Sequence, residues 1–96
     1  MSYENIPLHL NATEHRFEMT VEDQPAFIDY KQAGDKMYLV HTEVAEALEG
    51  RGVAAALVDK TLHYLEEHKL KLVPLCSYVQ HYVRKHPEWK RLVVEE

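Results

Sequence analysis

Between positions 6 and 43 the apolar residues mostly recur at every second position, which is the period of a half-buried β-strand. Short polar or glycine-containing turns separate four such runs. The pattern therefore predicts four strands, and short connections between successive strands favour an antiparallel meander. The predicted strands span residues 8–11, 16–21, 26–31 and 36–43.

After residue 43 the period changes from two to that of a helix. Residues 53–67 carry a single apolar stripe, which predicts an amphipathic helix. The stripe consists of Val53, Ala54, Leu57, Val58, Thr61, Leu62 and Leu65. Residues 71–75 are apolar almost without alternation, which predicts a strand covered on both faces. A strand–helix–strand crossover places the strands 36–43 and 71–75 parallel.

The end of the chain predicts one more helix, over residues 78–85, with Ser77 as its N-cap. His86-Pro87 ends it, because a proline disfavours helix at the residue before it. Residues 89–94 are expected to add a turn or an edge strand. The whole pattern predicts one α+β domain spanning residues 1–96, with a mixed sheet and helices on its faces.

Composition narrows the class of protein. The chain has 96 residues, of which 46% are hydrophobic, and a formal net charge of -5. This acidic balance argues against a nucleic-acid partner, since the basic residues form no continuous stripe. No segment approaches the length of a transmembrane helix, and the first ten residues do not resemble a signal peptide. The single cysteine fits a reducing compartment, so a cytoplasmic location is expected.

The sequence Gly50-Arg51-Gly52 stands between the fourth strand and the first helix. Glycines allow close approach to the backbone, and the free N–H groups and dipole of a helix start favour an anion. The Walker pattern is absent. The dinucleotide fingerprint is absent as well, because its third glycine would fall at Ala55. The turn is read either as a phosphate-binding loop or as ordinary loop chemistry.

The sequence Glu49-Gly50-Arg51-Gly52-Val53-Ala54 resembles the pyrophosphate loop of the GNAT superfamily of acyl-CoA N-acetyltransferases, written [QR]-x-x-G-x-[GA]. Gly52 and Ala54 match the glycine and small-residue positions, whereas Glu49 departs from the first. The similarity covers roughly residues 9–89, and is closest to the small single-domain GNAT-like proteins of the YjdJ type. Its specific clusters are His41-Thr42, Pro74-Leu75-Cys76 and His86-Pro87-Glu88-Trp89.

The resemblance implies that acetyl-CoA is the cosubstrate and that the sheet splays between the last two strands to admit its pantetheine arm. Main-chain groups near Thr42, Glu43 and Val44 would bond the pantetheine amides. The pyrophosphate would be held by the N–H groups of Gly50, Arg51, Gly52, Val53 and Ala54. The chain lacks the helix pair that walls the acceptor site of larger members, so an open acceptor side is expected.

Three residues are candidates for the chemistry. Cys76 ends the last strand where the resemblance places the acyl thioester, so its thiolate could accept the acetyl group; the alternative is a small buried hydrophobe. His41, expected in phase with Leu39, could act as a general base because imidazole titrates near neutral pH. Its alternative is a half-buried histidine bonded to backbone. Glu43 is the next candidate base.

Tyr78 and Tyr82 either pack the last helix or line the acyl pocket, where a tyrosine could protonate the leaving thiolate. The remaining histidines share no metal-ligand spacing, so no metal site is expected.

The sequence thus favours an acetyl-CoA-dependent N-acetyltransferase acting on an unidentified amine, either a small molecule or a protein lysine, by direct transfer or through acetyl-Cys76. The alternative is a CoA- or acyl-CoA-binding module with little or no transferase activity. A purely structural interaction domain would bind no CoA.

Overall fold

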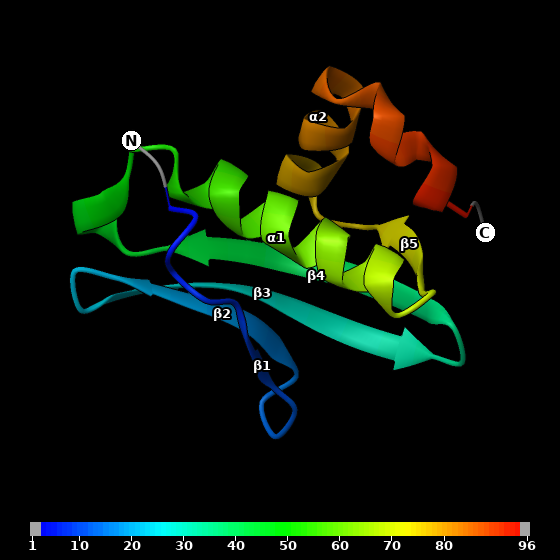
Figure 1. Ribbon diagram of the computed structural model, residues 1–96, viewed down its shortest axis with the longest axis horizontal. Helices are drawn as coiled ribbons and strands as arrows, with labels where there is room; N and C mark the ends of the chain where they lie inside the picture. Colours follow the sequence, from blue (N-terminus) through cyan, green and yellow to red (C-terminus); the bar gives the residue numbers. More distant parts are fainter. Residues whose placement is uncertain (1–2, 95–96) are drawn as a thin grey trace.

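The computed structural model describes residues 3–94, whose five strands form one mixed sheet in the order β1-β2-β3-β4-β5 (Figure 1). The first four strands pair antiparallel and β5 pairs parallel with β4, as predicted. The strands are β1 (His9–Asn11), β2 (Arg16–Val21), β3 (Gln24–Ala33), β4 (Lys36–Val44) and β5 (Lys71–Pro74). The chain therefore has the predicted α+β architecture.

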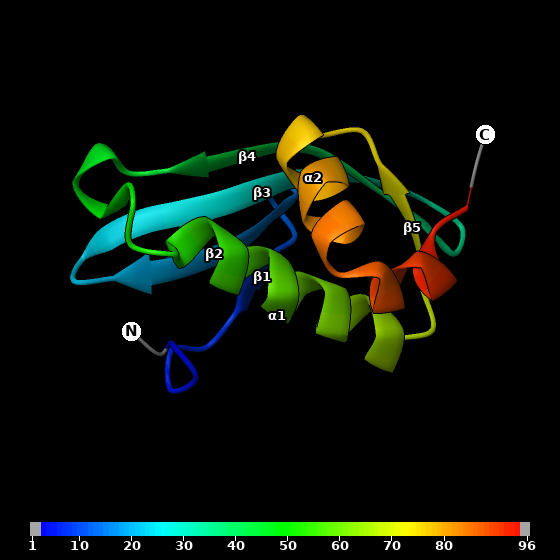
Figure 2. The same ribbon diagram turned by 90° about the horizontal axis from the view of Figure 1, so that it is seen from above.

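In the described part of the chain, two α-helices and two short 3₁₀ helices accompany the sheet. They are η1 (Glu46–Leu48), α1 (Val53–Glu67), α2 (Ser77–Lys85) and η2 (Pro87–Leu92). Figures 1 and 2 show α1 running along one face of the sheet, while α2 and η2 lie at its β5 end. None of the helices within residues 3–94 is long and apolar enough to span a bilayer.

The hydrophobic core lies between α1 and the inner face of the sheet. Phe17, Ile28 and Leu39 from the strands and Leu57 and Leu62 from α1 are all fully buried. Each such side chain contributes roughly 1.5–3 kcal/mol relative to an exposed one. The predicted helical stripe is confirmed except at its start, where Ala54 is only partly buried.

The outer face of the sheet carries polar side chains. Arg16 donates to Asp29 at 2.8 Å and lies over the ring of Phe27 at 4.0 Å. Such partly exposed contacts add little stability individually.

A β-bulge interrupts β4 at Val40. Ile28 pairs with Thr42 and Asp29 with His41, but the next pair is Tyr30 with Leu39. The extra residue on β4 reverses the alternation, because two successive side chains then point away from the core. The prediction that His41 is in phase with Leu39 is therefore wrong: Leu39 is fully buried, whereas 57% of the His41 side chain is exposed.

The parallel pair β4–β5 ends at this bulge. Leu39 is paired with Pro74, and the N–H groups of Leu75 and Cys76 then both donate to the Leu39 carbonyl, at 3.1 and 2.9 Å. Beyond Leu39, β4 continues to Val44 while the chain after β5 turns into α2 (Figure 1). The predicted splay between the last two strands is thus present.

The start of α2 differs from the sequence prediction, and the chain after α2 extends it. Ser77 is the first helical residue and Cys76 occupies the N-cap, so the predicted Ser77 cap is wrong. At the other end, η2 is followed by a parallel bridge between Leu72 and Val93, and the Val94 N–H donates to the Leu72 carbonyl at 2.9 Å. The tail therefore forms a helical turn and also covers the β5 edge.

Candidate functional site

The Gly50-Arg51-Gly52 loop connects η1 to α1. Gly50 and Gly52 both have φ = 77°, a left-handed conformation that costs other residues about 1–2 kcal/mol. Apart from its chain neighbours, no atom of residues 3–94 lies within 4 Å of a Cβ built at either glycine. The glycines are therefore required by the backbone conformation, and the space above them is open to a ligand.

Amide groups face this open space without protein acceptors. The first N–H groups of an α-helix have no carbonyl one turn earlier to bond. Within residues 3–94 no carbonyl accepts a hydrogen bond from the N–H of Gly52, Val53, Ala54 or Ala55, whereas the Arg51 N–H donates to Leu48 at 3.3 Å. The start of α1 thus presents a group of free donors at the positive end of the helix dipole.

A pocket of about 270 Å³ adjoins these amides. Its walls come from the end of β4, the glycine loop, the first turn of α1 and the start of α2. Six of the residues predicted to bind the coenzyme line it: Val44, Gly50, Gly52, Val53, Ala54 and Tyr78. The fold therefore brings together in one pocket residues that are up to 34 positions apart in the chain.

The side chain of Arg51 lies away from the loop amides. Its guanidinium forms an ion pair with Glu22 in the β2–β3 turn, and the Tyr3 hydroxyl donates to the Arg51 carbonyl at 2.7 Å. The hydrogen bond from Arg51 holds the pKa of Glu22 below its usual value and in turn raises the pKa of Arg51. In this conformation Arg51 fixes the loop to the hairpin.

Cys76 and Thr42 meet at the splay between the strands. The Sγ of Cys76 lies 3.3 Å from the Oγ1 of Thr42, and Cys76 is buried. Burial raises the pKa of this thiol, but the Thr42 hydroxyl and the N–H groups of Val79 and Tyr78 in the first turn of α2 favour the thiolate more strongly, so the pKa lies below its usual value.

His41 and Glu43 lie on the outer face of the sheet. Their side chains are 57% and 62% exposed, and the His41 Nε2 is 3.6 Å from the Glu43 Oε1. Beyond the bulge at Val40 the strand alternates regularly, so Thr42, which lies between them in sequence, faces the inner side where it contacts Cys76. The two candidate bases therefore lie near the gap between β4 and β5, but on the opposite face of the sheet from the pocket.

Tyr78 and Tyr82 occupy different surroundings. Tyr78 lines the pocket, and burial raises its pKa, which keeps the phenol protonated. Tyr82 is buried against α1, where its hydroxyl donates to Asp59 at 3.2 Å. Burial and this carboxylate together raise the pKa of Tyr82 far above its usual value. Tyr78 is thus the tyrosine placed to touch a ligand in the pocket.

Sequence reasoning missed two features of the site. Ala55 and Leu48 also line the pocket, and Thr42 contributes its side chain as well as its backbone. Ala55 could have been predicted, because it is a small residue that directly follows Ala54 in the loop pattern. The Thr42 contact depends on the bulge, for which the sequence gives no marker. Within residues 3–94 no group of three metal-binding side chains converges.

A family model for GCN5-related N-acetyltransferases matches residues 16–92. The chain belongs to this family. Protein NATD1 of Homo sapiens is 33% identical over 86 residues, which cover 84% of this chain and 76% of that protein. Protein NATD1 of Xenopus tropicalis is 38% identical over 63 residues, covering 65% and 58%.

The structural comparison agrees with membership of the GCN5-related family. A GCN5-like protein from Staphylococcus aureus, solved in solution by NMR, superposes with a TM-score of 0.71 over 97% of this chain and 92% of that one. The two chains are 22% identical, so this likeness establishes the fold. The recognition of the GNAT superfamily from the glycine loop is confirmed, while the narrower YjdJ type stays a prediction.

Proposed function

We propose that this protein is an acetyl-CoA-dependent N-acetyltransferase that acts on an amine. The observation that carries the proposal is the position of the free amides at the start of α1 relative to the splay of β4 and β5. Val44 and Tyr78 line the pocket beside these amides, and each lies two residues beyond the Thr42–Cys76 pair. A ligand lying along this path would have its anionic end at the glycine loop and its other end at Cys76.

The residues present suit the chemical groups of acetyl-CoA. The N–H groups of Gly52, Val53 and Ala54 are free to hold a pyrophosphate, and the open space over the glycines admits it. No strand within residues 3–94 pairs with residues 40–44 of β4 on the β5 side. Their backbone groups are available to the pantetheine amides, as in the addition of a strand.

In the direct route the acceptor amine attacks the thioester carbonyl, the CoA thiolate leaves, and a base takes the proton from nitrogen. An acceptor approaching from the outer face of the sheet would meet His41 first, with Glu43 3.6 Å from it. The neutral phenol of Tyr78 lines the pocket and is a donor for the departing thiolate. This assignment uses His41 as a general base and Tyr78 as a general acid.

In the two-step route the Cys76 thiolate attacks the thioester carbonyl, CoA leaves as its thiolate, and acetyl-Cys76 forms. The acceptor amine then attacks this second thioester, Cys76 leaves as its thiolate, and a base takes the proton from nitrogen. The lowered pKa of Cys76 supports this route, because the thiolate is the nucleophile. Because Cys76 is buried, the thioester of acetyl-CoA would have to reach it through the gap between β4 and β5. The acceptor is either a small amine or an exposed lysine of a protein.

One observation favours a second candidate, a CoA-binding module without turnover. His41 and Glu43 are the predicted bases, and the bulge directs both away from the inner side where Thr42 and Cys76 meet. A chain that holds the coenzyme on one face and its bases on the other would bind acetyl-CoA and transfer nothing.

The test is intact-protein mass spectrometry after incubation with acetyl-CoA, with CoA binding measured by calorimetry on the same samples. A hydroxylamine-labile acetyl adduct that is lost in Cys76→Ala supports the two-step route. Turnover with amines that survives in Cys76→Ala but falls in His41→Gln supports the direct route. CoA binding without turnover supports the second candidate, a CoA-binding module. Absence of CoA binding overturns the proposal.

A further inference from the structure

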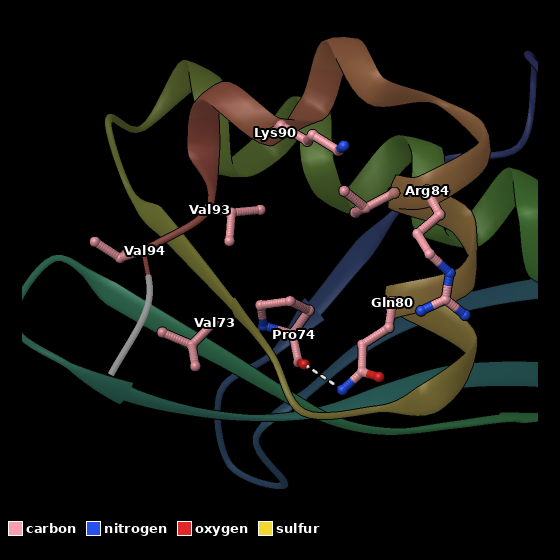
Figure 3. A pocket seen from close by; sticks show the side chains of 8 residues that line it. Val73, Pro74, Gln80, Arg84, Lys90, Val93 and Val94 are labelled. Carbon is pink, nitrogen blue, oxygen red and sulfur yellow. Dashed lines mark hydrogen bonds between the residues drawn. The ribbon is translucent and has the colours of Figure 1, made fainter.

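A second, larger hollow lies beyond the edge of β5, between that strand, α2 and the residues after η2 (Figure 3). Its volume is about 770 Å³, and it shares no lining residue with the pocket at the glycine loop. Its floor is apolar and includes Val73, Pro74, Val83 and Val93. We call this hollow the β5 groove.

The polar residues that line the β5 groove are Gln80, Arg84 and Lys90, and none of the acidic residues between positions 3 and 94 lines it. This is unusual in a chain of net charge -5. Figure 3 shows Arg84 and Gln80 side by side on α2, with the Arg84 guanidinium directed down toward Gln80, and Lys90 extending over the groove from η2. The groove is thus a positive site on an acidic protein.

Arg84 differs from the other arginines of the chain. Arg16, Arg51 and Arg91 each form an ion pair with a carboxylate. Among residues 3–94 neither Arg84 nor Lys90 has an acidic partner within ion-pair distance. Within this described part of the chain, the two cations at the apolar groove thus have no carboxylate partner and can pair with an anionic ligand.

We propose that the β5 groove binds a small carboxylic acid with an apolar body. The planar guanidinium of Arg84 matches a carboxylate, which it can bind through two parallel hydrogen bonds. Gln80 donates to the Pro74 carbonyl at 2.9 Å through one amide hydrogen and keeps its other hydrogen for a ligand. The valines of the floor would cover the aliphatic or aromatic part of the acid.

A phosphate group fits the β5 groove less well. Many phosphate sites in proteins combine cationic side chains with the free N–H groups of a helix start, and in this structure such N–H groups lie at α1, beside the other pocket. The α2 residues that line the groove belong to the middle and last turn of that helix, near the negative end of its dipole. A monoanion with an apolar body therefore matches the groove better than a dianion.

The test uses the full chain labelled with ¹⁵N, titrated with hexanoate, with hexylamine and with inorganic phosphate while amide shifts are recorded. Hexanoate is expected to shift the amides of Val73, Arg84 and Val93 in a saturable way. Hexylamine carries the same body with the opposite charge and is expected to leave them unchanged. Because the cations are exposed, the double variant Arg84→Gln/Lys90→Gln should weaken hexanoate binding about tenfold.

The matched control is Lys31→Gln/Lys85→Gln, which removes the same charge from exposed lysines outside the groove lining and should leave hexanoate binding unchanged. The proposal is overturned if hexanoate causes no saturable shifts at the groove, or if hexylamine binds there equally well. It is also overturned if phosphate competes with hexanoate at equal affinity, or if the control variant loses binding as strongly as the test variant.

Discussion

The Sγ of Cys76 lies 3.3 Å from the Oγ1 of Thr42, across the point where β4 and β5 separate. This contact joins the N-cap of α2 to the strand that follows the bulge at Val40. It places the one thiol of the chain beside a hydroxyl and the first amides of α2. The reactivity of Cys76 should therefore depend on Thr42.

Replacing Thr42 by valine tests this dependence. Burial raises the pKa of Cys76 and the Thr42 hydroxyl lowers it, so Thr42→Val should raise the pKa. The rate of alkylation by iodoacetamide, followed against pH by mass spectrometry, should shift to higher pH in the variant. Thr42→Ser keeps the hydroxyl and should retain the original profile. Identical profiles for the wild type and Thr42→Val would show that the hydroxyl does not stabilise the thiolate.

The same lowered pKa predicts a pH-dependent contribution to stability. A group whose pKa is lower in the folded state contributes stability that is fully present above its unfolded pKa, about 8.5 for cysteine, and lost as the pH falls through the folded value. The difference in free energy of unfolding between wild type and Cys76→Ala should therefore increase from neutral pH to about pH 10. Urea denaturation at several pH values measures it. A difference that stays constant or falls would contradict the lowered pKa.

Gly52 and Gly34 form a matched pair for testing the coenzyme loop. Both have positive φ, 77° and 62°, and at both a built Cβ has no atom of the described residues within 4 Å except those of its chain neighbours. Alanine at either position should cost about 1–2 kcal/mol of stability through backbone strain. Gly52→Ala should in addition weaken CoA binding at least tenfold, because its methyl group enters the space in front of the free amides.

Gly34→Ala lies in the β3–β4 turn and should leave CoA affinity unchanged. Calorimetric titration of CoA and thermal denaturation of both variants separate the two effects. Equal CoA affinities for Gly52→Ala and Gly34→Ala would remove the glycine loop from the binding site.

Substituting the two tyrosines of α2 should have different effects: one on stability, the other on kcat. Tyr82→Phe removes the hydrogen bond to Asp59 and should cost about 1 kcal/mol of stability, with little change in acetyl transfer. Tyr78→Phe keeps the packing of the helix and should lower kcat while CoA affinity is retained, since its hydroxyl is proposed to protonate the departing thiolate. A loss of stability in Tyr78→Phe alone, with kcat unchanged, would reverse these assignments.

Much of the fold follows from local pattern. The strands 16–21 and 36–43 and the helix 53–67 are predicted from the period of their apolar residues, and the structure places them within one residue of those bounds. Gly50 and Gly52 also indicate a turn with positive φ from the sequence alone, because only glycine adopts φ = 77° without strain. These strands, the helix and the glycine turn depend on residues close together in sequence, so they can be predicted from one sequence.

The arrangement of the site follows from tertiary structure. The sequence by itself determined the hairpins, the crossover and a helix start suited to an anion. Only the folded chain decided that the bulge at Val40 turns His41 outward, that Thr42 rather than His41 meets Cys76, and that Arg51 pairs with Glu22. The last two are contacts between residues far apart in sequence. The first is a one-residue change of register between β3 and β4, which reverses the face of every side chain beyond it.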